Sequence, residues 1–377
     1  MKSVEIFSGA GGLAKGLDLA GFEHAAFVEW NKDACASLRR NFSPEIVYCG
    51  DIQEYDFTKL SQVDVVAGGP PCQPFSLGGK HQADLDQRDM FPYAIKSIET
   101  LQPRLFIFEN VKGLLRESFA DYFNYILLRL ANPCQPAPSG VDWQTHLHQL
   151  RSKKSGVASG VKYHVSYRLL NAADYGVPQC RERVVIVGVR EDISATWQFP
   201  QATHTEERLL YDQYVTGEYW ERHGVAKKDR PPLGPSLRER ADAIRGDYVL
   251  FKPEGKPWRT VRDVLDGVPH PSKNHGIPDH IFRDGARSYP GHTGSCYDLP
   301  AKTIKAGGHG VPGGENMIRY PDGSIRYFTV FEAKRIQTFP DDYVITGAWG
   351  EALRQIGNAV PVMLGEHLGQ SAMQLLK

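Results

Sequence analysis

The chain of 377 residues is 41% hydrophobic and 23% charged, which excludes a disordered or collagen-like protein. Lysine and arginine together number 44, as do aspartate and glutamate, so any nucleic acid must be bound by locally concentrated cations. The six cysteines form no CxxC pair, no apolar run is long enough to span a bilayer, and the N-terminus lacks a signal-peptide core. We therefore expect a cytoplasmic protein without a disulfide framework or a metal site.

Short apolar runs alternate with helix-like stretches through the first half of the chain. Seven runs indicate buried strands, at residues 4–7, 25–28, 45–48, 63–67, 105–108, 165–170 and 184–189. Strands that alternate with helices form a parallel sheet with right-handed crossovers. The pattern predicts an α/β fold with a doubly wound, mostly parallel seven-stranded sheet, whose ligands bind beyond the carboxyl ends of the strands.

The length of the chain predicts two domains, or one large domain with an insert. Residues 132–162 are rich in Pro, Gly and Ser and indicate a surface insertion, and the alternation of strands and helices disappears between about 198 and 322. Helical periodicity returns at 328–339 and 359–376. We expect one domain built from residues 1–197 and 345–377, and a second, smaller and irregular domain at 198–344.

A glycine-rich turn, FSGAGG at residues 7–12, directly follows the first strand. Glycines there let the backbone approach a ligand at the start of the next helix. Glu29 ends the second strand, where a carboxylate could bind ribose hydroxyls, and Asp51 ends the third, where it could hold an adenine amino group. The turn lacks the dinucleotide pattern GxGxxG, which disfavours a nicotinamide cofactor. A plain tight turn beside two solvated acids is the alternative.

The fourth strand leads into GGPPCQP at residues 68–74. Two prolines force an extended path, which would project Cys72 beyond the edge of the sheet where ligands bind. An exposed thiolate at that edge could act as a nucleophile, although a single cysteine is more often a small buried hydrophobic residue.

Charged residues flank two further strands. Glu109 follows the apolar run 105–108, where partial burial would favour the protonated carboxyl group that donates a proton. Arg181 and Arg183 precede the run 184–189, and alternation puts both guanidinium groups on one face, suited to a planar, electron-rich ligand or a phosphate. An exposed loop acid and a salt-bridged edge strand are the alternatives.

The order of these elements resembles the cytosine-5 DNA methyltransferase family. The resemblance rests on FSGAGG, VEW at 28–30, GDI at 50–52, GGPPCQPFS at 68–76, ENV at 109–111, NAADYGVPQCRER at 171–183, RIQTFPD at 335–341 and QIGNAVP at 355–361. It covers roughly residues 1–195 and 326–377. It implies a catalytic domain that binds S-adenosylmethionine, a target-recognition domain at 198–344, and double-stranded DNA in the cleft between them.

The resemblance also implies roles for individual residues. Cys72 would be the nucleophile, Glu109 the acid and Arg183 the contact to the cytosine carbonyl oxygen, with support from Arg181. The residues implied to contact the cofactor are Phe7, Gly9, Gly11, Gly12, Glu29, Trp30, Asp51, Ile52, Gly69, Pro71, Asn358 and Val360. The residues expected to contact DNA are Gln73, Ser76, Lys80, Arg88, Lys302, Lys305 and His309. Arg181 and Arg183 are expected on the same cationic face, with some of Lys227, Lys228 and Arg230.

The reaction that the family performs requires these residue types. Carbon 5 of cytosine is a poor nucleophile, and a thiolate added at carbon 6 turns the ring into an enamine-like nucleophile towards a methyl sulfonium. A proton on ring nitrogen 3 and an arginine on the carbonyl oxygen stabilise the developing charge. The target base must leave the stacked duplex to reach these groups, and residues 74–89 are expected to close over it as a mobile lid.

We therefore expect a monomeric enzyme of the prokaryotic restriction-modification type that methylates one cytosine in a short duplex sequence. A restriction endonuclease acting on the same sequence is an expected functional partner, without a stable complex. Two alternatives stay open. The first is the same chemistry on tRNA, which a transfer assay on both substrates would separate. The second is a non-catalytic DNA-binding relative, which the presence of Cys72, Glu109, Arg183 and FSGAGG disfavours.

Overall fold

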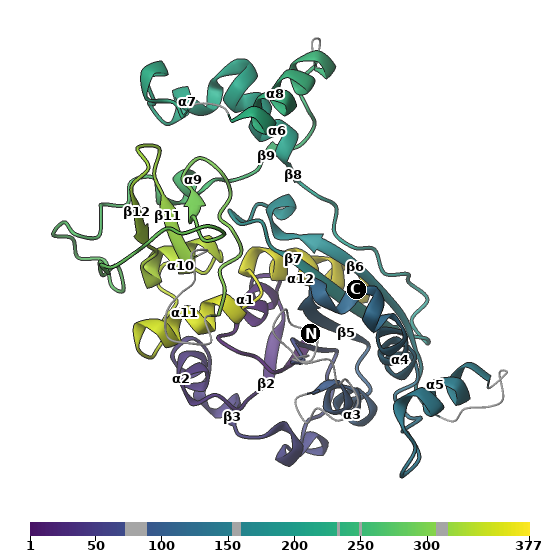
Figure 1. Cartoon of the computed structure of the whole chain (residues 1–377). Coiled ribbons are helices and arrows are strands. Elements are labelled where there is room, and N and C mark those ends of the chain that lie inside the picture. The colour runs from purple at the N-terminus through teal and green to yellow at the C-terminus, as the bar shows by residue number, and fades with distance from the viewer. Residues whose placement is uncertain (72–88, 153–159, 232–233, 249–250, 307–315) are drawn as a thin grey trace. The chain divides into compact units, whose positions relative to one another are not determined.

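The computed structural model describes residues 1–71, 89–152, 160–231, 234–248, 251–306 and 316–377 (Figure 1). The chain divides into two compact units. The first contains residues 1–170, 182–200 and 365–377, and the second contains residues 171–181 and 201–364. The assignment of residues 1–197 and 345–377 to catalysis and of 198–344 to target recognition stays a prediction.

A seven-stranded, mostly parallel sheet forms the centre of the first unit. The strands are β1 (Lys2–Ile6), β2 (Glu23–Glu29), β3 (Val47–Cys49), β4 (Val65–Gly68), β5 (Leu105–Val111), β6 (Tyr163–Asn171) and β7 (Glu182–Arg190). Their order in the sheet is β3-β2-β1-β4-β5-β7-β6, and β7 runs antiparallel to β5. Because the chain winds outwards in both directions from β1 and β4, the predicted doubly wound α/β fold is confirmed.

Helices cover both faces of this sheet. They are α1 (Gly12–Leu19), α2 (Lys32–Asn41), α3 (Phe91–Leu101), α4 (Ala120–Ala131) and α12 (Val362–Leu376), whereas α5 (Trp143–Ser152) packs against α4. Val66 and Phe106 share a hydrophobic cluster with α3 and α4, whereas Phe27 packs on α1 and α2. Burial of both faces explains why β4, β5 and β7 are nearly continuous apolar runs. None of the described helices combines the length and the apolar character needed to cross a membrane.

Glycines allow α1 to pack closely on the first half of α12. A Cβ atom at Gly16 would lie 2.5 Å from backbone atoms of Gly365 and Glu366, and a Cβ atom at Gly369 would lie 2.7 Å from the side chain of Ala20. These distances are shorter than van der Waals contact, so the two helices approach as they do because no side chain lies between them.

The ends of several elements differ from those that the apolar runs predict. β5 continues past residue 108 to Val111 because β7 supplies a partner backbone, with Glu109 opposite Val185 and Val111 opposite Arg183. The prediction that Glu109 follows the strand was therefore wrong, since Glu109 lies within it.

The last helices begin later than predicted. Thr329 caps α10 (Val330–Ile336) through a reciprocal capping box with Glu332, and an extended backbone at Ala359 precedes Pro361 and α12. The predicted insertion 132–162 also contains a helix, α5, which packs against α4.

The second unit is built from short elements. They are β8 (His204–Thr205), α6 (Glu206–Tyr211), α7 (Glu218–Arg222), α8 (Pro235–Asp247), β9 (Lys256–Pro257), α9 (Val261–Leu265), β10 (Ser295–Cys296), β11 (Met317–Arg319), β12 (Ile325–Tyr327), α10 and α11 (Trp349–Asn358). β10, β11 and β12 form one small sheet, and β8 pairs with β9. The helices α6 to α9 fall in the region predicted to be irregular. Their apolar faces are short, so their periodicity is weak in the sequence.

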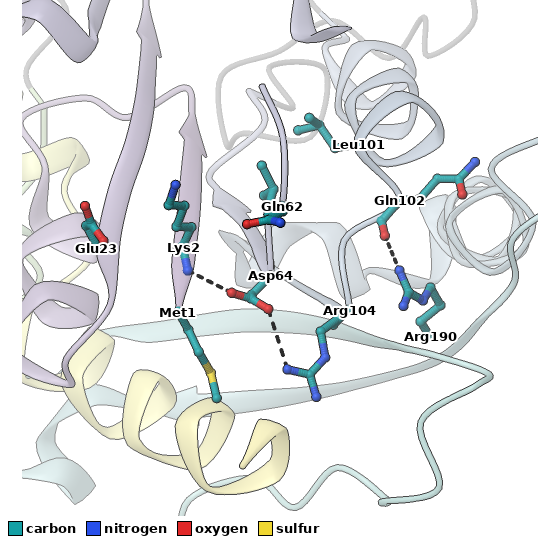
Figure 2. A pocket seen from close by; sticks show the side chains of 10 residues that line it. Met1, Lys2, Glu23, Gln62, Asp64, Leu101, Gln102, Arg104 and Arg190 are labelled. Carbon is teal, nitrogen blue, oxygen red and sulfur yellow. Dashed lines mark hydrogen bonds and ion pairs between the residues drawn. The ribbon is translucent and has the colours of Figure 1, made fainter. Parts of the chain in front are cut away.

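A cavity of about 590 Å³ opens at the amino-terminal edge of the large sheet (Figure 2). At its centre, Asp64 Oδ2 accepts the backbone N–H of Lys2 at 2.9 Å, and Asp64 Oδ1 lies 3.5 Å from Arg104 Nη1. Ligands of doubly wound sheets bind at the opposite, carboxyl edge. This cavity therefore does not belong to the predicted site.

Candidate active site

The carboxylate of Glu29 organises the turn that follows β1. Its Oε2 accepts the backbone N–H of Gly9 at 2.7 Å, and its Oε1 accepts those of Trp30 and Asn31 at 3.0 and 2.8 Å. Glu29 ends β2 and is only 7% exposed. Hydrogen bonds from three backbone donors compensate for the burial of this charge and tie the glycine-rich turn to the end of β2.

The backbone of the glycine-rich turn is left-handed at three positions. The φ angles are 53° at Phe7, 52° at Gly9 and 80° at Gly11. A left-handed conformation is unfavourable for phenylalanine, and such strain is concentrated at functional sites. Gly11 is the N-cap of α1 and no side chain caps it, so the turn leaves the first N–H groups of the helix beside the carboxyl edge of the sheet.

Polar and aromatic side chains continue along the same edge after β2 and β3. Trp30 is 80% exposed. Asp51 is exposed and accepts the backbone N–H of Gln53 at 2.9 Å, while Ile52 is buried beneath it. The N–H of Gly50 donates to the carbonyl of Glu29 at 2.9 Å, which joins the two strand ends. The edge therefore carries an exposed aromatic ring as well as the carboxylates of Glu29 and Asp51.

Glu109 and Arg183 form an ion pair across β5 and β7. Glu109 Oε1 lies 2.6 Å from Arg183 Nε, and the two side chains are 11% and 12% exposed. A nearby pair, Lys112 and Glu182, lies at 2.8 Å but is about half exposed. Since solvent screens the exposed pair more strongly, the Glu109–Arg183 pair is the stronger constraint on side-chain position.

The segment that leads into Cys72 runs beside Glu109. A Cβ atom at Gly69 would lie 3.4 Å from Glu109 Oε2, and Asn110 Nδ2 donates to the carbonyl of Pro70 at 3.0 Å. Pro71 is exposed. Cys72 itself lies outside the described residues, together with the predicted DNA contacts Gln73, Ser76, Lys80, Arg88 and His309.

A further acid, Glu5, lies inside β1 close to the glycine-rich turn. It is 1% exposed, and its Oε1 has no hydrogen-bond partner among the described residues. Burial raises the pKa of this carboxyl group to about 8. The sequence carries a signal for it, a charged residue within an apolar run, but Glu5 was not among the predicted site residues.

Arg181 belongs to the second unit and binds backbone carbonyls. Its Nη1 donates to Ile304 O at 3.2 Å, and its Nη2 donates to Gly357 O at 2.8 Å and to Ala359 O at 3.0 Å. The residue is 1% exposed, so the prediction that it shares a cationic face with Arg183 was wrong. The carbonyls at the end of α11 lack helical partners, and a guanidinium group satisfies several of them at once.

The other predicted residues of the second unit differ in exposure. Asn358 is exposed and Val360 is buried. Lys302 and Lys305 are both exposed, and Lys302 Nζ donates to Thr293 Oγ1 at 3.0 Å. Within the described ranges, no group of three or more His, Cys, Asp or Glu residues is placed to hold a metal ion.

The sequence matches a known protein family over most of its length. The family model for C-5 cytosine-specific DNA methylase matches residues 1–133 and 144–374. The chain belongs to this family. It is 29% identical over 382 residues to the Type II methyltransferase M.NgoMIV of Neisseria gonorrhoeae, which covers 100% of this chain and 98% of the relative. It is 30% identical over 381 residues to the Type II methyltransferase M.PspPI of Psychrobacter sp. (strain TA137), which covers 99% of this chain and 79% of the relative.

Solved structures agree at the level of the fold. The S. pombe Dnmt2 methyltransferase has a TM-score of 0.57 at 15% identity, with 100% of this chain and 99% of that chain covered. A Spodoptera frugiperda DNMT2 mutant has a TM-score of 0.58 at 17% identity, with 99% of each chain covered. The chain is accordingly a DNA cytosine-5 methyltransferase with the fold of that family, whose members use S-adenosylmethionine.

Three residues of this methylase were not singled out from the sequence although they lie within its family motifs. Asn110 follows Glu109 in ENV and orients Pro70, as described above. Gln179 and Gln337 are fully buried and hydrogen-bonded to each other at 3.0 Å, although 158 positions separate them. A polar amide inside a family motif is a sequence signal for a functional or structural role. The sequence does not show which residue each amide binds, because the two glutamines lie far apart in the chain.

Proposed function

We propose that this methyltransferase flips one cytosine out of a specific short DNA duplex and methylates carbon 5 through a covalent adduct with Cys72. The observation that carries the proposal is the buried Glu109–Arg183 pair beside Gly69 and Pro70. An acid, a guanidinium group and the segment that precedes the nucleophile are thus assembled at the carboxyl edge of one sheet.

The residues along this edge fit S-adenosylmethionine. Glu29 ends β2 beside the glycine-rich turn, and its carboxylate would accept the ribose hydroxyls. The exposed ring of Trp30 would cover one face of the adenine, and Asp51 would accept its amino group. When bound, the cofactor supplies an electrophilic methyl group on a sulfonium centre. Asn358 and Val360 are likewise proposed to contact the cofactor.

The side chains of the enzyme prepare cytosine to react. The thiolate of Cys72 adds to carbon 6, and the electron pair of the carbon 5–carbon 6 double bond moves into the ring. Glu109 donates a proton to ring nitrogen 3, and Arg183 donates hydrogen bonds to the carbonyl oxygen, so negative charge does not accumulate. After carbon 5 is methylated, a base removes its proton and the returning electron pair expels the thiolate of Cys72, while ring nitrogen 3 returns its proton to Glu109.

The biological setting is proposed from the named relatives. Both M.NgoMIV and M.PspPI are Type II methyltransferases. We therefore propose that methylation by this enzyme protects a short DNA sequence from a restriction endonuclease of the same specificity, and that the enzyme acts as a monomer in the cytoplasm.

The proposal is tested by expression in a host without cytosine methylation, followed by bisulfite sequencing of its DNA. We expect one cytosine within one short sequence to be protected, and the Cys72→Ala variant to protect none. DNA with 5-fluorocytosine at the target position should trap a covalent complex with the wild-type enzyme, because the fluorine cannot leave as a proton. Cys134→Ala, a change in the predicted insertion, is the matched control and should retain activity.

Methylation by Cys72→Ala at the wild-type rate would overturn the covalent mechanism. Transfer to tRNA but not to duplex DNA in a parallel assay would overturn the proposed substrate. Retention of S-adenosylmethionine binding by Cys72→Ala shows that a loss of activity is chemical and does not arise from misfolding.

A further inference from the structure

The end of α11 is held by buried side chains from distant parts of the second unit. Gln337 Nε2 donates to Ile356 O at 2.7 Å and to Ala359 O at 3.2 Å. Arg181 Nη2 donates to Gly357 O and again to Ala359 O. The two donor residues thus bind three carbonyls at the end of α11, those of Ile356, Gly357 and Ala359. Of these, Ile356 O also accepts the backbone N–H of Ala359 at 3.2 Å.

The start of α12 is hydrogen-bonded to Gln337, which also binds the end of α11, and to its neighbour Thr338. The N–H of Val362 donates to Gln337 O at 3.0 Å, and the N–H of Met363 donates to Thr338 Oγ1 at 2.9 Å. Residues 355–357 and 359–362 are all buried, and Asn358 between them is exposed. Within this buried segment, the polar side chain of Asn358 therefore faces solvent.

The same group of side chains also holds residue 304. Gln179 Oε1 accepts the N–H of Ile304 at 2.9 Å, and Arg181 Nη1 donates to Ile304 O at 3.2 Å. A Cβ atom at Gly357 would lie 2.6 Å from the N atom of Ala306, so the helix end and the segment that contains Ile304 are in direct contact. Gln179, Arg181 and Gln337 are 0%, 1% and 0% exposed.

We propose that Gln179, Arg181 and Gln337 form a polar brace whose task is to position Asn358 for S-adenosylmethionine. The inference rests on the proposed cofactor role of Asn358. Arg181 is then a positioning residue, which acts through the backbone at 356–359 and does not touch the cytosine. Residues 356, 357 and 359 are buried, so their carbonyls are satisfied by the side chains of Arg181 and Gln337 and not by water. Burial of three polar side chains to fix one short segment indicates a demand for precise placement.

The test compares cofactor binding with stability in variants of the full-length enzyme. Gln337→Met keeps the side-chain volume but removes the amide, and we expect it to weaken S-adenosylmethionine binding about tenfold, the effect of one lost buried hydrogen bond. Arg181→Lys keeps the charge but reaches fewer carbonyls, and it should weaken binding less. Isothermal titration calorimetry measures the affinity, and thermal denaturation measures stability. If Gln337→Met fails to fold, Arg181→Lys carries the test.

A matched control separates positioning from stability. Tyr219→Phe removes a fully buried hydroxyl group that contacts Thr260 and Asp298 in the same unit, and it should lower the melting temperature without changing cofactor affinity. A double-mutant cycle adds a second readout. In an Asn358→Ala background, Gln337→Met should weaken binding by less than twofold, since the side chain through which it acts is gone.

The proposed positioning role would be overturned if Gln337→Met and Arg181→Lys bound S-adenosylmethionine as tightly as the wild type. It would also be overturned if the effects of Gln337→Met and Asn358→Ala on the binding free energy were fully additive. The failure of the proposed function would look different, because the wild-type enzyme itself would then show no S-adenosylmethionine binding.

Discussion

The proposed protonation of the cytosine ring depends on the carboxyl group of Glu109. It is buried, it contacts Arg183 at 2.6 Å, and its other oxygen lies beside Gly69. Glu109→Gln preserves shape but cannot donate an acidic proton. We expect the methylation rate at saturating substrates to fall about 10²- to 10⁴-fold, the usual contribution of general acid catalysis. A single-turnover transfer assay measures this rate.

The control for this variant lies on the neighbouring strand. Glu182→Gln breaks the exposed ion pair with Lys112 and should leave the methylation rate within about twofold of wild type, since exposed pairs contribute little. Equal decreases in the methylation rate of Glu109→Gln and Glu182→Gln would show that the rate depends on the loss of any nearby negative charge and not on proton donation by Glu109.

Glu29 is the corresponding residue for cofactor binding. In the wild type, both carboxylate oxygens of Glu29 accept backbone N–H groups, from Gly9, Trp30 and Asn31. The Glu29→Gln variant keeps only one acceptor oxygen and loses the negative charge. The dissociation constant for S-adenosylmethionine should rise about ten- to a hundredfold, because a hydrogen bond to a charged group is worth about 1.5–3 kcal/mol. Equilibrium dialysis measures it. Glu23→Gln, at the other end of β2, should bind the cofactor normally.

Sequence could indicate which residue types belong to the site, but not their pairings. Glu29 at the end of a strand followed from the apolar run before it. The burial of Arg181 did not follow, because its acceptors lie 123 to 178 residues further along the chain. The same holds for Glu109, since the antiparallel strand that extends β5 is more than 70 residues away in sequence. These facts depend on tertiary contacts, which local patterns do not contain.

At the scale of elements, apolar runs located the strands of the first unit because parallel strands are buried on both faces. The ends were less predictable, since caps such as Thr329 and the partner strand decide where pairing stops. Helices α6 to α9 were missed for a related reason. Most have five or six residues, which is less than two turns and too short for a clear periodic pattern.

The contact between α1 and α12 gives a prediction at this scale. Gly16→Ala places a methyl group against the backbone of Gly365 and Glu366, and neither helix can move without disturbing the sheet. We expect the free energy of unfolding to fall by about 1–3 kcal/mol through overpacking. Urea denaturation followed by circular dichroism measures the change.

A second helical glycine serves as the reference. Gly246 lies in α8, and a Cβ atom there would meet nothing within 4 Å. Gly246→Ala should be neutral or stabilising by up to about 1 kcal/mol, because alanine favours the helix. A stabilising effect of Gly16→Ala would contradict the close packing of α1 on α12.

At the scale of the whole molecule, Glu5 links the stability of the central sheet to pH. Burial raises the pKa of its carboxyl group to about 8, whereas its ordinary value is 4.5. Between these values the folded protein holds a proton that the unfolded chain releases. Stability from this group is therefore complete below about pH 4.5 and is lost as the pH rises through about 8.

The Glu5→Gln variant tests this dependence. The free energy of unfolding of the wild type relative to the variant should decline from pH 5 to pH 8, by at most about 1.4 kcal/mol per pH unit for one proton. Urea titrations of both proteins at four pH values give the difference. A constant difference across this range would contradict the proton uptake by Glu5.

The antiparallel register of β5 and β7 governs where the chain tolerates a change of length. Each residue from Leu105 to Val111 faces one partner between Arg183 and Val189. Removal of one residue from β7 would turn its side chains to the opposite face, so Arg183 would no longer meet Glu109. The family match skips residues 134–143, of which 134–142 lie between α4 and α5 and belong to no strand. An affinity tag inserted there would leave every strand pairing in place.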